Sequence, residues 1–261
     1  MRERGQSTVE YAGMCLIAAL LLLGAAQLAE ARLRPAAPAG DAGWLVLARR
    51  YAPTFVPESG DGEQPVDFRR CRVPACARGA RPVLYIHAVR RGSATYLEYW
   101  EYLPDSRTAH TGIPAFDGYH RDDWEGLIVK LRPDGAVVGA RASAHLGWAG
   151  RHPWWDLARG DWAPYPAPVF RASGSHAGSF QRRGVDVAGD AWDGDAPGAQ
   201  PPLLVAADAA RTGAPPFDPG ATPPWKKQVW SDPEAVTTGP PGSSGRYARY
   251  ARWWADLCRI C

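Results

Sequence analysis

The residues from Asp123 to Leu131 alternate in chemical character, and this alternation is the strongest constraint on the fold. Successive side chains of an extended strand point to opposite faces. One face therefore carries two acids followed by three apolar residues: Asp123, Glu125, Leu127, Val129 and Leu131. The turn pair Asp134-Gly135 comes next, and residues 136–144 are suited to pair back as a second strand.

Further β-like runs lie on both sides of this hairpin. Residues 82–90 and 95–103 predict a second hairpin, and residues 168–172 and 203–207 predict two shorter strands. Helical spacing occurs at 44–51 and 246–257. Many short strands separated by turns predict a mainly β fold, namely a β-sandwich with short peripheral helices.

The N-terminal segment predicts one transmembrane helix. Residues 12–26 carry no charge, and with Leu28 and Ala29 the run is just long enough to span a bilayer. Arg2 and Arg4 precede it, which keeps the N-terminus in the cytoplasm. We expect a leader and transmembrane segment at 1–30, a Pro/Ala/Gly linker at 31–43 and an extracytoplasmic domain at 44–261. The protein would be single-pass in the cell membrane, and the segment is either an anchor or a signal peptide.

The stretch Gly5-Gln6-Ser7-Thr8-Val9-Glu10-Tyr11 resembles the leader of the type IV pilin-like family, especially the Flp and TadE-type pilins. The resemblance implies cleavage after Gly5, with Glu10 paired to the new N-terminal amine of a neighbouring pilin-like subunit. It also implies a place at the cell surface after processing.

Composition limits the kinds of partner that the protein can bind and the roles that its cysteines can have. The net charge of +3 comes from mixed acids and bases with no basic block that suggests nucleic-acid binding, so no nucleic-acid partner is expected. Besides Cys15, the cysteines form two close pairs, Cys71/Cys76 and Cys258/Cys261. Four thiolates can bind one zinc ion, but an oxidising compartment favours one or two disulfides. The sequence leaves their connectivity open.

Asp123 and Glu125 end an otherwise apolar face, where two anions cannot both stay ionised without compensation. A bound cation, Arg121 or a shared proton would provide it. His120 can reach the same point, and Asp105 follows a predicted strand that can lie alongside. This mostly oxygen ligand set favours Mg²⁺, Ca²⁺ or Mn²⁺ over structural zinc. A structural network of arginines and carboxylates is the alternative.

Three blocks of the sequence resemble the necrosis- and ethylene-inducing-protein-like cytolysins. The blocks are Tyr102-Leu103-Pro104-Asp105, the run from His120 to Val129, and Ala142-Ser143-Ala144-His145. That family is a β-sandwich with the heptapeptide Gly-His-Arg-His-Asp-Trp-Glu, whose divalent cation helps to bind sphingolipid sugar headgroups. The resemblance implies a set of cation ligands, direct or water-bridged: Asp105, His120, Asp123 and Glu125. It also implies that His145 flanks the site.

The sequence departs from that heptapeptide at two positions. Tyr119 replaces its glycine and Asp122 replaces its second histidine. A second resemblance, to the vacuolar-sorting-protein-62-like family, rests on residues 47–53, 122–125 and 173–177. His176 lies in the last of these blocks, and we expect it to line the site together with Arg121 and Asp122.

These observations favour a binding module over an enzyme. The expected function is cation-dependent recognition of a lipid or glycan headgroup by a membrane-tethered domain. Two alternatives stay open, a metal-dependent hydrolase of the phosphoesterase kind and a minor pilin-like structural subunit.

Overall fold

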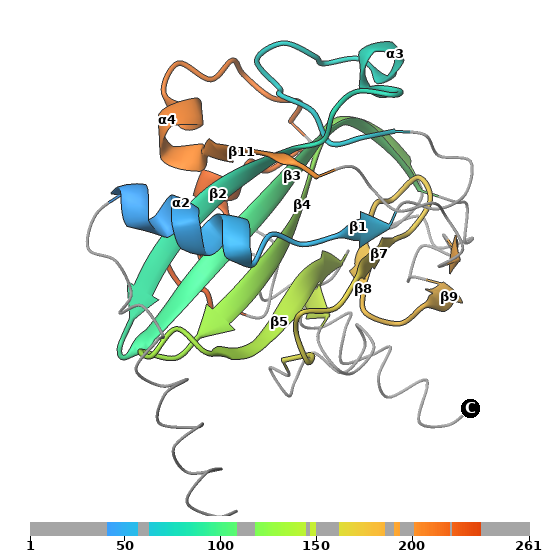
Figure 1. Cartoon of the computed structure of the whole chain (residues 1–261). Coiled ribbons are helices and arrows are strands. Elements are labelled where there is room, and N and C mark those ends of the chain that lie inside the picture. The colour runs from blue at the N-terminus through green and yellow to red at the C-terminus, as the bar shows by residue number, and fades with distance from the viewer. Residues whose placement is uncertain are drawn as a thin grey trace, which may run out of the picture.

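The computed structural model describes residues 41–56, 63–108, 118–144, 147–149, 162–185, 191–193, 201–219 and 221–235. The fold is mainly β, with two mixed sheets and a few short helices (Figure 1). Several predicted features lie outside these ranges: Gly5, Glu10, the apolar run, His145, the helix at 246–257, Cys258 and Cys261. Within the described ranges, no helix has the length and apolar character needed to cross a membrane.

The larger sheet has six strands in the order β11-β2-β3-β4-β5-β6. These strands are β2 (Val83–Arg91), β3 (Ala94–Thr108), β4 (Gly118–Leu131), β5 (Val137–Ala144), β6 (Gly147–Ala149) and β11 (Leu203–Ala206). All neighbours are antiparallel except β11, which runs parallel to β2. Both predicted hairpins are confirmed, and Gly135 turns the second one with a left-handed φ of 77°.

A smaller sheet packs against one face of the larger one. It contains β1 (Phe55–Val56), β7 (Val169–Arg171) and β8 (Gly178–Ser179) in that order, while β9 (Arg183–Val185) and β10 (Ala191–Asp193) pair separately. Phe55 and Val169 meet Leu97 and Leu127 in a fully apolar core. The helix α2 (Asp41–Arg50) adds Leu47 to that core and begins three residues before the predicted domain boundary.

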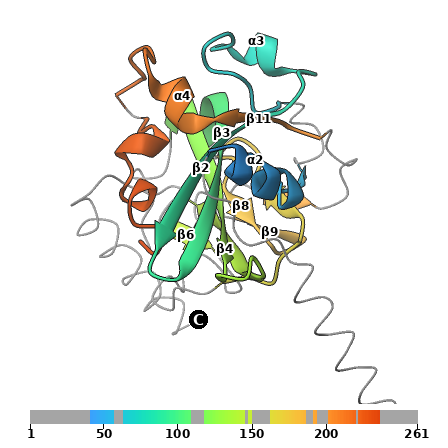
Figure 2. The ribbon, with the colours of Figure 1, turned by 60° about the vertical axis from the view of Figure 1, so that its left-hand side comes forward.

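The opposite face of the large sheet is aromatic. Trp124 lies 5.1 Å from Tyr102 and 5.6 Å from Phe68 between ring centroids. Short elements cover this face, namely α3 (Pro74–Ala77), α4 (Ala207–Arg211), η2 (Pro224–Lys226) and η3 (Gln228–Trp230). The large sheet is thus buried on both sides (Figure 2).

Residues 224–235, which we call the C-terminal cover, contact one of two buried ionisable side chains on the aromatic face. Glu98 and Arg141 stand on one rung of the sheet, with Ile128 between them. Arg141 donates hydrogen bonds to the carbonyl oxygens of Pro233 and, at 2.9 Å, Ala235. Burial raises the pKa of Glu98 well above its ordinary value.

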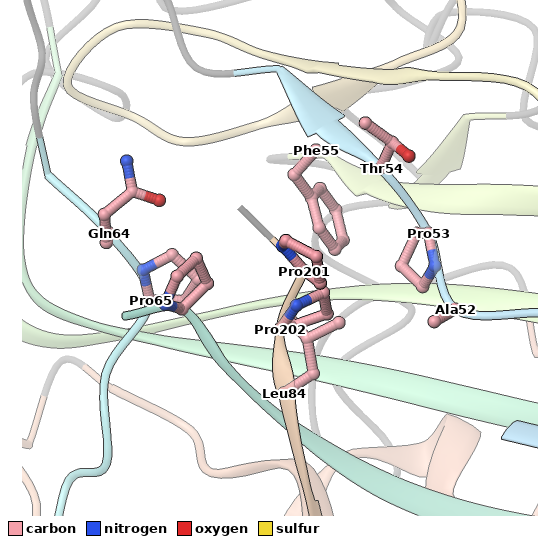
Figure 3. Close-up of a pocket in the computed structure, with 10 residues that line it drawn as sticks. Ala52, Pro53, Thr54, Phe55, Gln64, Pro65, Leu84, Pro201 and Pro202 are labelled. Carbon is pink, nitrogen blue, oxygen red and sulfur yellow. The ribbon is translucent and has the colours of Figure 1, made fainter. Parts of the chain in front are cut away.

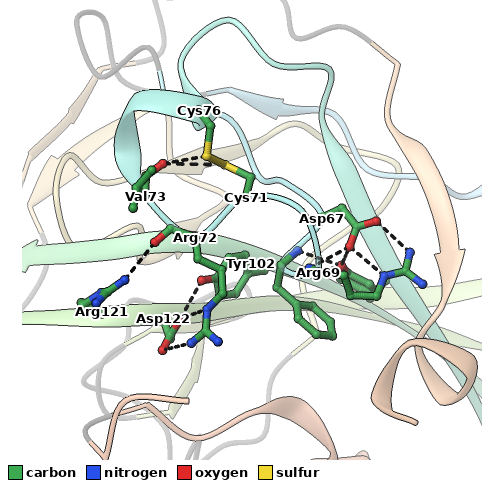
Figure 4. Close-up of a disulfide and its surroundings, with 11 residues drawn as sticks. Asp67, Arg69, Cys71, Arg72, Val73, Cys76, Tyr102, Arg121 and Asp122 are labelled. Carbon is green, nitrogen blue, oxygen red and sulfur yellow. Dashed lines mark hydrogen bonds and ion pairs between the residues drawn. A yellow bond between two sulfur atoms is a disulfide. The ribbon is translucent and has the colours of Figure 1, made fainter. Parts of the chain in front are cut away.

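The disulfide joins Cys71 to Cys76, with their Cα atoms 5.8 Å apart (Figure 4). Of the alternatives left open by the sequence, the short local pairing is therefore the one formed. The bond closes a loop that lies beside Asp122, as Figure 4 shows.

A pocket of about 220 Å³ lies between β1 and the start of β11 (Figure 3). Prolines line half of it: Pro53, Pro65, Pro82, Pro201 and Pro202. None of its lining residues carries a charge, and the predicted site residues are not among them.

Candidate functional site

The predicted site residues gather where β3 and β4 pair. In the register of these strands Glu101 lies opposite Glu125, and Asp105 lies opposite Arg121. Strand β4 begins at Gly118, ahead of the alternating residues 123–131, so the whole motif belongs to the sheet. Glu101, Asp105 and Asp123 are 0%, 2% and 7% exposed. We call Glu101, Asp105, Asp123 and Glu125 the carboxylate cluster.

Asp123 binds a histidine from a distant loop. The Nδ1 atom of His176 lies 2.9 Å from Oδ2 of Asp123, and its Nε2 lies 4.0 Å from a carboxylate oxygen of Glu63. Burial acts to raise the pKa of Asp123, but the hydrogen bond and charge of His176 outweigh it and hold that pKa below its ordinary value. His176 has a left-handed φ of 59°, which is rare for a non-glycine residue. The structure thus brings the predicted His176 to the motif.

Glu101 is a member of the cluster that the sequence analysis missed. One of its oxygens accepts a hydrogen bond from Nη1 of Arg171 at 2.9 Å, and both side chains are fully buried. Its second oxygen, Oε1, is buried without a hydrogen-bond partner among the described residues. Burial raises the pKa of Glu101, although the guanidinium of Arg171 opposes that shift. The pairing register of β3 with β4 could have identified Glu101, because this register places it opposite Glu125.

Glu125 turns toward the neighbouring strand β5. It accepts a hydrogen bond from the hydroxyl of Ser143, which in turn accepts one from the backbone N–H of Gly126 at 2.6 Å. Ser143 belongs to the Ser-Ala-His block of the sequence, whose histidine lies outside the described residues. The carboxylate of Glu125 is therefore oriented by the strand that follows it.

The remaining predicted residues lie at the edge of the cluster. Asp105 accepts a hydrogen bond from Nε of Arg107 at 3.2 Å. His120 is half-buried, and its Nε2 lies 4.0 Å from Oδ1 of Asp123. Arg121 is exposed and donates instead to the carbonyl oxygen of Arg72 at 3.3 Å.

Asp122 lies on the aromatic face, away from the contact between Asp123 and His176. Its carboxylate accepts hydrogen bonds from Arg72 (2.6 and 3.1 Å), the hydroxyl of Tyr102 (2.6 Å) and the backbone N–H of Asp218 (2.7 Å). Burial opposes its ionisation, but these donors lower its pKa below the ordinary value. Asp122 therefore links the motif by hydrogen bonds to two segments that are remote in sequence, around Arg72 and Asp218.

The carboxylate cluster does not present a ready-made ion cage. Among the described residues, no three His, Cys, Asp or Glu side chains meet in a group that could hold a metal ion. Arginine–carboxylate pairs, the alternative named above, are present at Glu101, Asp105 and Asp122. The donor chemistry nevertheless suits a hard cation, since the cluster supplies oxygen atoms and one of them is buried without a partner.

Gly174 makes the histidine loop possible, which gives a direct prediction. It has a φ of 73°, and a Cβ there would overlap the carbonyl oxygen of Arg107. Gly174→Ala should therefore push residues 172–177 off β3 and lower the free energy of unfolding by about 2 kcal/mol. Urea unfolding measures the loss, and the NMR shifts of the His176 ring report its separation from Asp123. Gly213→Ala is the matched control, since its φ is also 73° but a Cβ there meets nothing. A loss no larger than that of the control would contradict the steric argument.

No protein-family model matches the sequence, and no curated protein matches it significantly. Solved structures similar to the chain include NLPPya in complex with glucosamine, at 21% identity and a TM-score of 0.46, covering 78% of this chain and 93% of that one. NLPPya in complex with mannosamine has 21% identity and a TM-score of 0.45, covering 76% of this chain and 91% of that one.

A third similar structure is Necrosis and Ethylene inducing Protein 2 from the causal agent of cocoa's witches' broom disease. It has 20% identity and a TM-score of 0.41, covering 69% of this chain and 79% of that one. Identities and TM-scores at this level assign neither a family nor residue roles to the present chain.

Proposed function

We propose that this protein is a membrane-tethered, extracytoplasmic binding module that holds a divalent cation at the carboxylate cluster and recognises a lipid or glycan headgroup. The observation that carries the proposal is the buried Oε1 atom of Glu101, which has no hydrogen-bond partner among the described residues. A buried carboxylate oxygen without a partner is unfavourable, and a cation beside it would offset that cost.

The oxygen-rich composition of the cluster supports the same proposal. Cationic side chains already lie near its carboxylates, namely Arg171 at Glu101, Arg107 at Asp105, His176 at Asp123, and Lys227, whose charge acts on Asp123 and Glu125. Oxygen ligands favour Mg²⁺, Ca²⁺ or Mn²⁺. The bound cation would supply a positive centre to which headgroup oxygens bind.

The arrangement favours binding over hydrolysis. A general base must reach the proton that it removes. His176 is 2% exposed, and its Nδ1 is occupied by Asp123. The histidine with the shortest contact to the cluster is thus held inside the fold, which favours headgroup binding.

The membrane tether of the proposal rests on the sequence. The uncharged run at 12–26 and the arginines before it support a single anchor with the folded domain outside the cytoplasm. Recovery of the intact chain in the soluble fraction of lysed cells would contradict this part.

Isothermal titration of the full chain, held in nanodiscs, with Ca²⁺, Mg²⁺ and Mn²⁺ tests the cation site. We expect uptake of one ion per chain, and we expect Glu101→Gln and Asp123→Asn each to weaken it by about tenfold or more, because each removes a negative ligand. Glu98→Gln is the matched control, since Glu98 is an equally buried carboxyl whose Oε1 also lacks a hydrogen-bond partner among the described residues, but it lies on the opposite face of β3, away from the cluster. Absence of uptake by the unmodified chain, or an equal loss in the control, would overturn the proposal.

A further inference from the structure

The loop from Asp67 to Arg81 concentrates the positive charge of the chain. It contains five arginines and one acid, a net charge of +4, whereas the whole chain of 261 residues has +3. The rest of the chain therefore sums to −1. The arginines are Arg69, Arg70, Arg72, Arg78 and Arg81.

Two of these arginines pair with carboxylates, and three have no such partner among the described residues. Arg69 binds Asp67 through two hydrogen bonds of 2.7 and 2.8 Å, and Arg72 binds Asp122. Within the described part of the chain, Arg70, Arg78 and Arg81 are exposed and have no carboxylate partner. Their charges remain available to an anion from outside.

The fold holds this loop with its charges outward. Phe68, Cys71 and Ala77 are buried in the aromatic core, and the disulfide to Cys76 closes the tip. Val73, at the tip, is 50% exposed (Figure 4). An apolar side chain is thus exposed to water on the same loop as the guanidinium groups of Arg70, Arg78 and Arg81.

The loop is also joined to the candidate site. Arg121 donates to the carbonyl oxygen of Arg72, and Arg72 binds Asp122 of the motif (Figure 4). Tyr119, two residues before Arg121, is 59% exposed. Cations and apolar side chains therefore continue from the loop onto the start of β4.

We propose that the loop from Asp67 to Arg81 docks on an anionic phospholipid surface, with Arg70, Arg78 and Arg81 at the lipid phosphates and Val73 in the interface. Guanidinium groups bind phosphate oxygens with matched geometry. A soluble phosphate would leave Val73 in water, whereas a bilayer interface accommodates both the cations and the apolar tip. The inference rests on the tether of the proposed function, which brings the domain to a membrane, but it does not need the cation.

The test uses the full chain in phosphatidylcholine nanodiscs, co-sedimented with vesicles of phosphatidylcholine alone or with phosphatidylglycerol. We expect binding to the anionic vesicles, weakening with added salt. An arginine at an anionic surface contributes about 1 kcal/mol, or roughly fivefold in partition. The triple variant Arg70→Gln, Arg78→Gln, Arg81→Gln should therefore bind about 100-fold more weakly.

A matched control distinguishes the effect of the loop arginines from the effect of the total charge of the chain. Arg49→Gln, Arg50→Gln, Arg90→Gln removes the same charge from exposed positions on α2 and β2 and should reduce binding by less than about threefold. Val73→Asn removes the apolar side chain at an exposed position without changing the charge and should weaken binding about threefold or more.

Three results would overturn the inference. These are equal losses in the two triple variants, equal binding to both kinds of vesicle, and displacement by millimolar inorganic phosphate, which would indicate a soluble anion. Adding a chelator, which removes divalent cations, distinguishes docking of the loop from binding at the cation site. Docking of the loop persists in chelator and in the Asp123→Asn chain, so binding that vanishes under both conditions belongs to the carboxylate cluster and contradicts the role of the loop.

Discussion

Replacing Arg171 with leucine should lower the free energy of unfolding by about 3–5 kcal/mol. Arg171 is 1% exposed, and its Nη1 is 2.9 Å from the fully buried carboxylate of Glu101. Without it, Glu101 must either bury a charge or take up a proton, and burial already raises its pKa. The carbonyl oxygen of Glu63 also loses a donor at 3.0 Å.

Urea unfolding of three variants isolates this effect. The double variant Arg171→Leu, Glu101→Leu should recover most of the loss, because it removes both members of the buried pair. Arg107→Leu is the surface control, because the Arg107 side chain is 68% exposed and its pair with Asp105 is screened by water, so we expect a much smaller loss. If the double variant were as unstable as the single one, packing of the Arg171 side chain and not its charge would account for the loss.

The second large effect is expected at Asp122. Asp122→Ala should lower the free energy of unfolding by about 3 kcal/mol, because it removes one acceptor from Arg72, Tyr102 and Asp218 together. Tyr102 is fully buried, so its hydroxyl is then left without that partner. The left-handed φ of 61° at Asp122 adds to the loss for alanine.

Asparagine is the informative comparison at this position. It tolerates left-handed φ and keeps one acceptor oxygen, so Asp122→Asn should lose only about 1 kcal/mol. Thermal and urea unfolding with the disulfide intact measure both variants. Equal losses for the two variants would show that the charge, and not the backbone and acceptor together, dominates the effect of Asp122.

Local pattern was enough to predict the strands but not the contacts between remote segments. The alternation at 123–131 and the turn at Asp134-Gly135 predicted the β4–β5 hairpin, which is confirmed. The sequence pattern did not identify Glu101, because this residue lies in an aromatic run that resembles an ordinary core strand. Only the pairing register of β3 with β4 places it opposite Glu125.

The partners of the motif illustrate what local pattern leaves out. Arg72 and Asp218 lie 50 and 96 residues from Asp122, and His176 lies 53 residues from Asp123. No periodicity connects positions so far apart, since their contact depends on how the two sheets and the covering loops pack. The cation ligands stay a prediction, whereas the expected disulfide is present between Cys71 and Cys76, a pairing that the sequence left open.

The C-terminal cover has a consequence for the order in which the chain assembles. Strands β2 to β5 pair with their sequence neighbours, so the central sheet can form from local hairpins early. Residues 224–235 follow the end of β5 by 80 residues or more along the chain. Until then the guanidinium of Arg141 has no access to the carbonyl oxygens of Pro233 and Ala235, so the unfinished sheet carries a cation within its aromatic surface. A side chain that is costly to bury in the finished core would thereby disfavour aggregation of the partly folded sheet.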